Sequence, residues 1–538
     1  MVFARRSTTL LAAIIASCAM VLSLTACTSD NKTVVDGQTT VTSNSAGGVA
    51  VFTPSDGITL NQQTPLNKWA KLVPDLAKAL ADAGFKKGDI DHTTSDSLAK
   101  QSRAIQDFVV DHLSNNTTDD SGIAIAPDNM TLLVAPVVEA DASTRQYGDY
   151  VSQNLSTNDV TDEGATSDGE SSEDDSSNTE SDSTASDEQA QAVDRLVSSL
   201  KLAKESGMHV VLLGNSIEGY KPDAFVKFSD AQTIGKLQAE KMVSKLKLDK
   251  ASKDNPKYIE VLLPYTAMDE KGNANDSTFA QEAFRGIWQV LGSYYQKGVV
   301  ESPSGTLDGK STENDWQAVA YDAAKEGSTA KVLDKRLAKT DGQSTLTRID
   351  GIITMNDYIA SEVVKELDDL GYTGSAADIN PQITISGIVG NITGKKDLSR
   401  DAVPDPIKSP ENDNANDSSS SDDDADKDTS ASDKDRDSQW PLVTGYGAYV
   451  SNIPSIVNGK QWMTGMEDRQ TIATDIAQAC AKLNKDEALN SMPSIRNSEV
   501  GGVKKIPTIN EPLLAVSAGN LKSALIDPGY ISLADAGL

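Results

Sequence analysis

The hydrophobic positions of the chain follow two alternating spacings, and this pattern predicts an α/β protein. Short unbroken apolar runs, such as residues 131–136 and 209–213, indicate strands buried on both faces of a sheet. Between these runs, apolar residues recur three and four positions apart, as in amphipathic helices. Further strands are predicted at 49–52, 225–228, 258–263, 351–354 and 442–443. Helices are predicted at 64–83, 95–113, 192–206, 231–246, 280–295, 316–337, 358–370 and 470–483.

These strand and helix units are too many for one comfortable sheet. The pattern therefore predicts two lobes, each with a doubly wound parallel sheet, joined by a hinge that the chain crosses three times. The first lobe is assigned residues 49–221 and 470–495, and the second lobe is assigned 222–469 and 496–538. Ligands bind beyond the carboxyl ends of the strands in such sheets, so the candidate site lies between the facing lobes.

The first residues have the features of an export signal. Arg5 and Arg6 precede an apolar run at 10–24 that is short for a membrane span but suits a signal peptide. The run leads into Leu-Thr-Ala and then Cys27, which resembles the lipobox of bacterial lipoproteins. We expect a signal peptide at 1–26, a lipid on Cys27 and a flexible tether at 27–48, which would hold the protein on the outer face of the cytoplasmic membrane. An ordinary signal peptide with an incidental cysteine is the alternative.

Acidic charge is concentrated in two stretches. The chain has 79 acidic and 49 basic residues and a net charge of −30, of which residues 159–188 contribute −12 and residues 411–437 contribute −8. Both stretches are rich in Ser, Asp and Asn, so insertions at about 155–189 and about 405–438 are predicted to be disordered surface loops. The net charge excludes a nucleic-acid-binding protein that works by neutralising phosphates.

Several motifs in a fixed order resemble those of a known family. They lie at 134–136, 204–211, 228–238, 355–360, 444–468 and 506–530. Together they resemble the sugar-binding lipoproteins of ABC transporters, specifically the xylose and multiple-sugar group of the type I periplasmic-binding-protein fold. The similarity runs from Val49 to the end of the chain except in the two acidic insertions, and the segment at 506–530 matches best.

The resemblance implies a protein that captures a small polar ligand, expected to be a carbohydrate, and delivers it to an ABC permease. Sugar hydroxyls donate and accept hydrogen bonds and sugar rings have apolar faces, so such a cleft supplies carboxylates, amides, cations and aromatic rings. Closure of the lobes removes water from these groups. We expect a monomer with no cofactor, no metal and no nucleic-acid partner.

Several cleft positions differ from the family in chemical type. Gly214 and Asn215 replace an Asp-Arg pair, Gly447 beside Tyr446 replaces an Asp, and Glu467 replaces a Lys. These changes predict weaker sugar binding or a different selectivity. The candidate ligand-binding residues are Lys68, Trp69, Asn215, Asn273, Asn356, Asp357, Tyr446 and Glu467.

Some of these candidates have a purely structural explanation. Trp69 is at helical spacing and fits a hydrophobic core as well as a sugar platform. Asn356 or Asp357 can cap the helix that follows instead of touching a ligand. A calcium loop near Asn273 is excluded, because Ala274 and Ala280 replace the glycine and the bidentate glutamate that it requires.

Two further classes of protein stay open beside the importer. One is a sensor that presents its liganded form to a membrane receptor, and the other is a surface scaffold that has kept the fold and lost sugar binding. An enzyme is not expected. The chain has 3 histidines and no HExxH, GxSxG or P-loop signature, so no residue is assigned a catalytic role.

Overall fold

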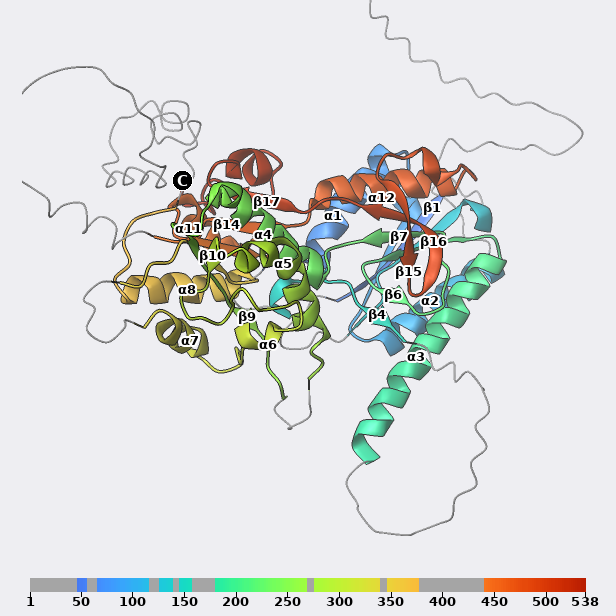
Figure 1. Cartoon of the computed structure of the whole chain (residues 1–538). Helices are drawn as coiled ribbons and strands as arrows, with labels where there is room; N and C mark the ends of the chain where they lie inside the picture. The colour runs from blue at the N-terminus through green and yellow to red at the C-terminus, as the bar shows by residue number, and fades with distance from the viewer. Residues whose placement is uncertain are drawn as a thin grey trace, which may run out of the picture. The chain divides into compact units, whose positions relative to one another are not determined.

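Parallel strands and covering helices make up most of the chain that the structure describes (Figure 1). The computed structural model describes residues 46–55, 65–115, 125–138, 145–156, 180–268, 275–338, 346–376 and 440–538. Cys27, Asn273, the signal peptide and the second acidic insertion lie outside these residues. The described residues all belong to one compact unit.

The first lobe is built on a seven-stranded sheet. Its strand order is β2-β1-β3-β5-β7-β16-β15, parallel throughout except that β15 runs antiparallel to β16. The strands are β1 (Gly48–Pro54), β2 (Ile90–Ser95), β3 (Met130–Val134), β5 (His209–Leu213), β7 (Ala224–Lys227), β15 (Ile495–Val500) and β16 (Val503–Asn510). A separate parallel pair joins β4 (Asn154–Leu155) to β6 (Ser216–Ile217).

The second lobe is built on a six-stranded sheet. Its order is β10-β8-β12-β13-β14-β17, parallel except that β17 runs antiparallel to β14. The strands are β8 (Lys257–Val261), β10 (Val300–Glu301), β12 (Gly351–Ile353), β13 (Leu442–Tyr446), β14 (Met463–Met466) and β17 (Leu514–Ser517). A parallel pair, β9 (Leu263–Pro264) and β11 (Ala320–Tyr321), follows its first two strands.

Both sheets have the doubly wound order in which the second strand lies outside the first and the third lies on the other side. The chain passes between the sheets at 228–230, 467–468 and 511–513. The predicted fold class, two doubly wound parallel-sheet lobes joined by three crossings, is confirmed.

The crossings correct the predicted boundaries at 221 and 495. Strands β7, β15 and β16 belong to the first sheet, although the sequence-based division places 222–469 and 496–538 in the second lobe. The reason is hydrogen bonding between distant segments, since Thr508 of β16 pairs with Phe225 of β7. Periodicity along the sequence does not contain that pairing.

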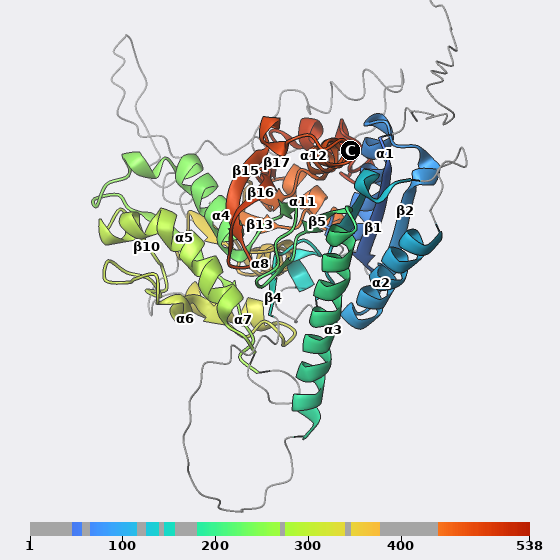
Figure 2. The same cartoon turned by 90° about the vertical axis from the view of Figure 1, so that its right-hand side faces the viewer.

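Helices cover both faces of each sheet, and in Figure 2 α3 lies beside α2. The helices of the first lobe are α1 (Trp69–Asp82), α2 (Leu98–Asn115), α3 (Glu180–Glu205) and α12 (Arg469–Leu483). Those of the second are α4 (Ala231–Leu246), α5 (Thr278–Gln296), α6 (Trp316–Val319), α7 (Ser328–Arg336), α8 (Asp357–Asp369) and α11 (Ile453–Val457). Short 3-10 helices lie at Lys87–Asp89, Pro127–Asn129, Arg145–Tyr147, Leu248–Lys250, Val450–Asn452 and Leu489–Ser491, and a short π-helix lies at Lys522–Ile526.

Two helix predictions are corrected. The single helix predicted at 316–337 is two helices, because β11 extends the backbone at Ala320–Tyr321 and Gly327, with φ of 70°, precedes α7. Helix α3 begins at Glu180, so the end of the first acidic insertion, predicted to be disordered up to about residue 189, is helical.

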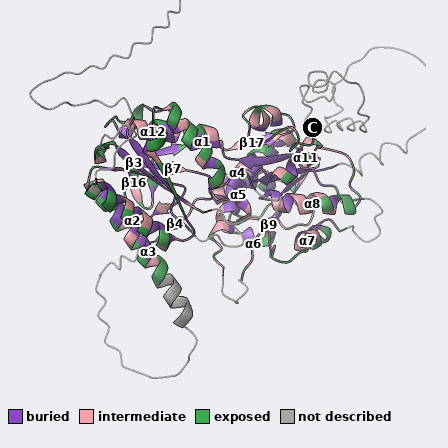
Figure 3. Cartoon of the chain, turned by 180° about the vertical axis from the view of Figure 1, so that it is seen from behind, coloured by how far each residue is buried: buried purple, intermediate pink, exposed green. Residues whose placement is uncertain are grey.

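The strands of both sheets are largely buried, as their purple colour in Figure 3 shows, and each sheet has an apolar layer on both faces. In β1, Val49 and Val51 pack under α1 and α12, whereas Ala50 and Phe52 face α2 and α3. This alternation is the period-two geometry of a strand. The second sheet is likewise covered by α4 and α5 on one face and by α7 and α8 on the other.

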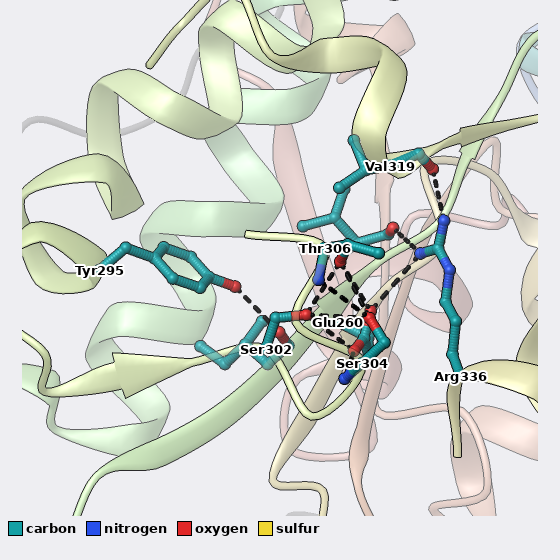
Figure 4. Close-up of polar contacts among 9 residues, drawn as sticks. Glu260, Tyr295, Ser302, Ser304, Thr306, Val319 and Arg336 are labelled. Carbon is teal, nitrogen blue, oxygen red and sulfur yellow. Dashed lines mark hydrogen bonds and ion pairs between the residues drawn. The ribbon is translucent and has the colours of Figure 1, made fainter. Parts of the chain in front are cut away.

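A buried ion pair joins β8 to α7 in the second lobe (Figure 4). The Glu260 carboxylate of β8 is fully buried and lies 3.5 Å from Arg336 Nη1. Glu260 Oε1 also accepts hydrogen bonds from the Ser302 hydroxyl and the Ser304 N–H, both at 2.8 Å. Arg336 donates to the carbonyls of Val261 and Val319 at 2.5 and 2.9 Å. The network therefore ties β8 to the segment after β10 and to α7.

Among the described residues, none of the helices combines the length and apolarity needed to cross a bilayer.

Candidate ligand-binding cleft

Loops at the carboxyl ends of both sheets meet between the lobes. Leu66, after β1, donates its N–H to the Gly447 carbonyl after β13 at 2.9 Å. The Tyr449 hydroxyl, also after β13, donates to the Gln146 carbonyl at 2.6 Å. The lobes therefore contact each other at the strand ends where the sequence places the site, and we call this region the cleft.

Lys68 and Trp69 lie at the start of α1, on the first-lobe side of the cleft. Lys68 Nζ pairs with Asp149 Oδ1 at 2.7 Å, and Asp149 Oδ2 accepts the Trp69 N–H at 3.0 Å. The Trp69 ring is 3% exposed and meets the rings of Tyr150 and Phe228 edge-on, at centroid distances of 5.1 and 5.7 Å. Both residues are thus placed at the cleft, and the tryptophan packs within the first-lobe core.

Gly214 and Asn215 follow β5. A Cβ atom on Gly214 would lie 3.6 Å from the Trp69 ring, and the residue has φ of 71°, which glycine adopts readily. The buried Asn215 amide is engaged at both ends, since Oδ1 accepts the Gln153 N–H at 3.0 Å and Nδ2 donates to the Pro136 carbonyl at 2.9 Å. Asn215 therefore fixes the loops that follow β3.

Asn356 and Asp357 follow β12 on the second-lobe side. Asn356 Oδ1 accepts the Ile359 N–H at 2.9 Å and caps α8, while its Nδ2 donates to Gln146 Oε1 at 3.1 Å. Asn356 therefore caps α8 and also contacts the first lobe.

The Asp357 carboxylate is fully buried and joins three elements of the second lobe. It accepts hydrogen bonds from the Tyr449 N–H at 2.9 Å, the Thr464 hydroxyl at 2.8 Å and the Gln461 amide at 2.7 Å. Burial raises the pKa of the Asp357 carboxyl to about 6, although these donors favour the charged form. Its hydrogen bonds secure the loop after β13.

Tyr446 and Glu467 lie at the hinge. Glu467 begins the crossing from β14 to α12, and its carboxylate accepts the N–H of Ser229, in the crossing from β7 to α4, at 2.6 Å. The Tyr446 hydroxyl contacts both the Ser229 hydroxyl and, at 3.4 Å, Glu467 Oε1. Burial raises the pKa of the Glu467 carboxyl to about 7, against the lowering effect of these donors. The pair thus links two crossings.

A segment that the sequence analysis did not single out contacts both lobes in this region. Residues 145–151, which we call the cleft segment, contain Gln146, Tyr147, Asp149 and Tyr150, each in contact with residues named above. The signal available in the sequence was two tyrosines around Gly148, soon after the carboxyl end of β3.

The site as described is rich in the groups that bind sugars, but many are already paired within the chain. Amide, carboxylate, ammonium and aromatic groups converge there, and the side chains of Lys68, Asn215, Asn356, Asp357 and Glu467 all have protein partners. No group of three or more His, Cys, Asp or Glu side chains that could hold a metal occurs among the described residues.

Two cavities lined by described residues involve none of the predicted ligand residues. One, of about 560 Å³, lies at the amino ends of the first sheet beside His209 and Asp223. The other, of about 620 Å³, follows β9 and β11 and is lined by Tyr265, Thr266, Trp316, Tyr321 and Lys325 among others. The second is beyond carboxyl ends of strands and is large enough for a small ligand.

No protein-family model matches the chain, and no curated protein sequence matches it. Similar solved structures include an ABC transporter solute-binding protein from Clostridium phytofermentans with bound β-D-glucose, at a TM-score of 0.45 and 17% identity over 91% of this chain and 99% of that chain. A carbohydrate transporter solute-binding protein from Chloroflexus aurantiacus, in complex with D-glucose, has a TM-score of 0.43 and 18% identity over 92% and 98%. A periplasmic ribose ABC transporter from Conexibacter woesei has a TM-score of 0.43 and 13% identity over 90% of this chain and 96% of that chain. Because these scores are low, the fold is assigned from the sheet order and crossings of the chain itself.

Proposed function

We propose that the chain is an extracytoplasmic solute-binding protein that captures a small polar ligand, a carbohydrate, and presents it to an ABC permease. The observation that carries this proposal is the pair of doubly wound sheets joined by three crossings, with polar loops from both sheets meeting at their carboxyl ends. The motifs at 355–360 and 506–530 support a sugar as the ligand. The protein acts as a monomer and performs no catalysis.

A thermal-shift screen of monosaccharides and oligosaccharides tests this function. A ligand that binds only the folded state stabilises it by about 2.7 kcal/mol at a concentration 100-fold above its Kd. We expect at least one sugar at millimolar concentration to raise the melting temperature of the protein. An unchanged melting temperature with every sugar of the panel contradicts carbohydrate binding. Amino acids and polyols are screened as the comparison set.

The proposed membrane anchor is tested separately at Cys27. Replacement of Cys27 by serine removes the thiol that would carry the diacylglycerol, so we expect the variant to incorporate no labelled palmitate and to leave the membrane fraction. The matched control is Cys18→Ala, which changes a cysteine inside the proposed signal peptide and should label like the wild type. Equal labelling of the Cys27→Ser variant contradicts the anchor.

A scaffold that has lost sugar binding is the second candidate function. The observation that favours it is the internal pairing of the cleft residues. Asn215 and Glu467, which stand where the family has charged ligand-binding groups, hydrogen-bond to the chain's own backbone. The sugar screen separates the two candidates, since a scaffold gives no shift while keeping a cooperative unfolding transition.

A further inference from the structure

The cleft segment is held by the first lobe through its second half. Asp149 bridges Lys68 and the N–H of Trp69, and the Tyr150 hydroxyl donates to the Lys68 carbonyl at 2.5 Å. The Tyr150 ring stacks on Phe228 at a centroid distance of 4.8 Å. A Cβ on Gly148 would lie 2.6 Å from the Asn67 carbonyl oxygen, so only glycine permits this close approach.

The same segment is held by the second lobe through its first half. Gln146 receives two hydrogen bonds, one on its side chain from Asn356 and one on its carbonyl from Tyr449. The Tyr147 ring is 1% exposed and packs against Phe279 of α5 and Tyr446 of β13, at centroid distances of 4.7 and 6.3 Å. The polar amide of Gln146 and the aromatic ring of Tyr147 thus make, from within the chain, the kinds of contact that a bound ligand would make.

The substituted cleft positions fit this internal occupant. A Cβ on Gly447 would lie 2.9 Å from the Tyr449 ring, so a larger residue there would displace the ring that binds Gln146. Asn215 binds the backbone of Gln153 just beyond the segment, and a Cβ on Gly214 would lie within van der Waals range of the Trp69 ring that contacts Tyr150. The changes at Gly447 and Asn215 are therefore compatible with the observed packing of the segment and of the residues that follow it.

We propose that residues 146–150 of the cleft segment occupy the cleft as an internal ligand and hold the two lobes closed when no solute is bound. This inference rests on the two-lobed solute-binding architecture proposed above. A sugar that enters the cleft must displace Gln146 and Tyr147. Its apparent affinity is therefore its intrinsic affinity multiplied by the fraction of molecules in which the segment is released. The closed form, whose surface a membrane partner would recognise, is then present without a solute.

Lobe separation in the absence of sugar tests the proposal. Spin labels on cysteines at Asp107 of α2 and Lys365 of α8, both exposed, report the distance between lobes in the full-length lipoprotein in detergent micelles. We expect the wild type to give one short distance that addition of glucose does not shorten. We expect Tyr147→Ala, which removes the buried ring, to raise the open-to-closed ratio about a hundredfold or more. Tyr294→Ala, on the outer part of α5, should leave the distance unchanged.

A milder variant keeps the test informative if Tyr147→Ala does not fold. Tyr449→Phe removes only the hydroxyl that donates to Gln146, a hydrogen bond whose loss is expected to speed amide hydrogen exchange in the cleft segment about fivefold. The matched control is Tyr294→Phe, which removes the hydroxyl bonded to Asp249 at 2.5 Å. A wild type that is open without sugar, or unchanged exchange in Tyr449→Phe, overturns the inference. Neither readout requires a sugar to bind, so a negative sugar screen does not contradict the inference.

Discussion

Replacement of Glu260 by alanine is expected to lower the free energy of unfolding by about 3–5 kcal/mol, because it leaves the buried Arg336 guanidinium without its counter-ion. Glu260 is 0% exposed and the Arg336 side chain is 8% exposed, so water cannot replace the lost carboxylate. The hydroxyl of Ser302 and the N–H of Ser304 lose their acceptor as well. Urea denaturation of the variant and the wild type measures the difference.

A surface pair in the same lobe provides the control for Glu260. Glu282 and Arg285 form an ion pair on α5 in which the two side chains are 34% and 40% exposed. Glu282→Ala should therefore cost about 0–1 kcal/mol. A loss of less than about 1 kcal/mol in Glu260→Ala would show that the buried network does not stabilise the second lobe.

Replacement of Glu467 by glutamine is expected to remove a pH dependence of about 3 kcal/mol from the free energy of unfolding. Burial raises the pKa of the Glu467 carboxyl from 4.5 to about 7, so the folded state favours the protonated form. Its stabilising contribution is complete below pH 4.5 and is lost as the pH rises through about 7. The wild type should thus lose stability over this range relative to the variant, in which the side chain at this position stays neutral.

The measurement is urea unfolding of both proteins at several values from about pH 4 to about pH 8. The charged groups that face Glu467 include Asp230, which raises its pKa, while Ser229 and Tyr446 donate hydrogen bonds to it. Glu499→Gln, an exposed glutamate in β15, should follow the wild type at every pH. Parallel pH profiles for the wild type and Glu467→Gln would contradict a neutral hinge carboxyl.

The fold was predictable from sequence where burial on both faces makes a strand continuously apolar. The run at 131–136 overlaps β3 and the run at 209–213 coincides with β5, and both strands lie inside the first sheet. The boundaries between lobes were not predictable in the same way. The place of strand β16 beside β7 is decided by pairing between residues far apart along the chain.

The candidate site was predictable in position but not in its contacts. Strand ends located Asn215 and Asn356 at the cleft, because ligand-binding loops follow the carboxyl ends of parallel strands. Their partners come from elsewhere, and the Asn356 to Gln146 bond joins residues 210 positions apart. Local patterns also cannot distinguish a tryptophan that stacks on a ligand from one that, like Trp69, packs on Tyr150.

A crystal structure of the protein grown without any sugar tests most directly whether the chain fills its own cleft. It should show the Gln146 carbonyl accepting a hydrogen bond from Tyr449 and the Tyr147 ring between Phe279 and Tyr446. A structure with separated lobes, a solvent-filled cleft and residues 146–150 in contact with the first lobe alone would contradict the account.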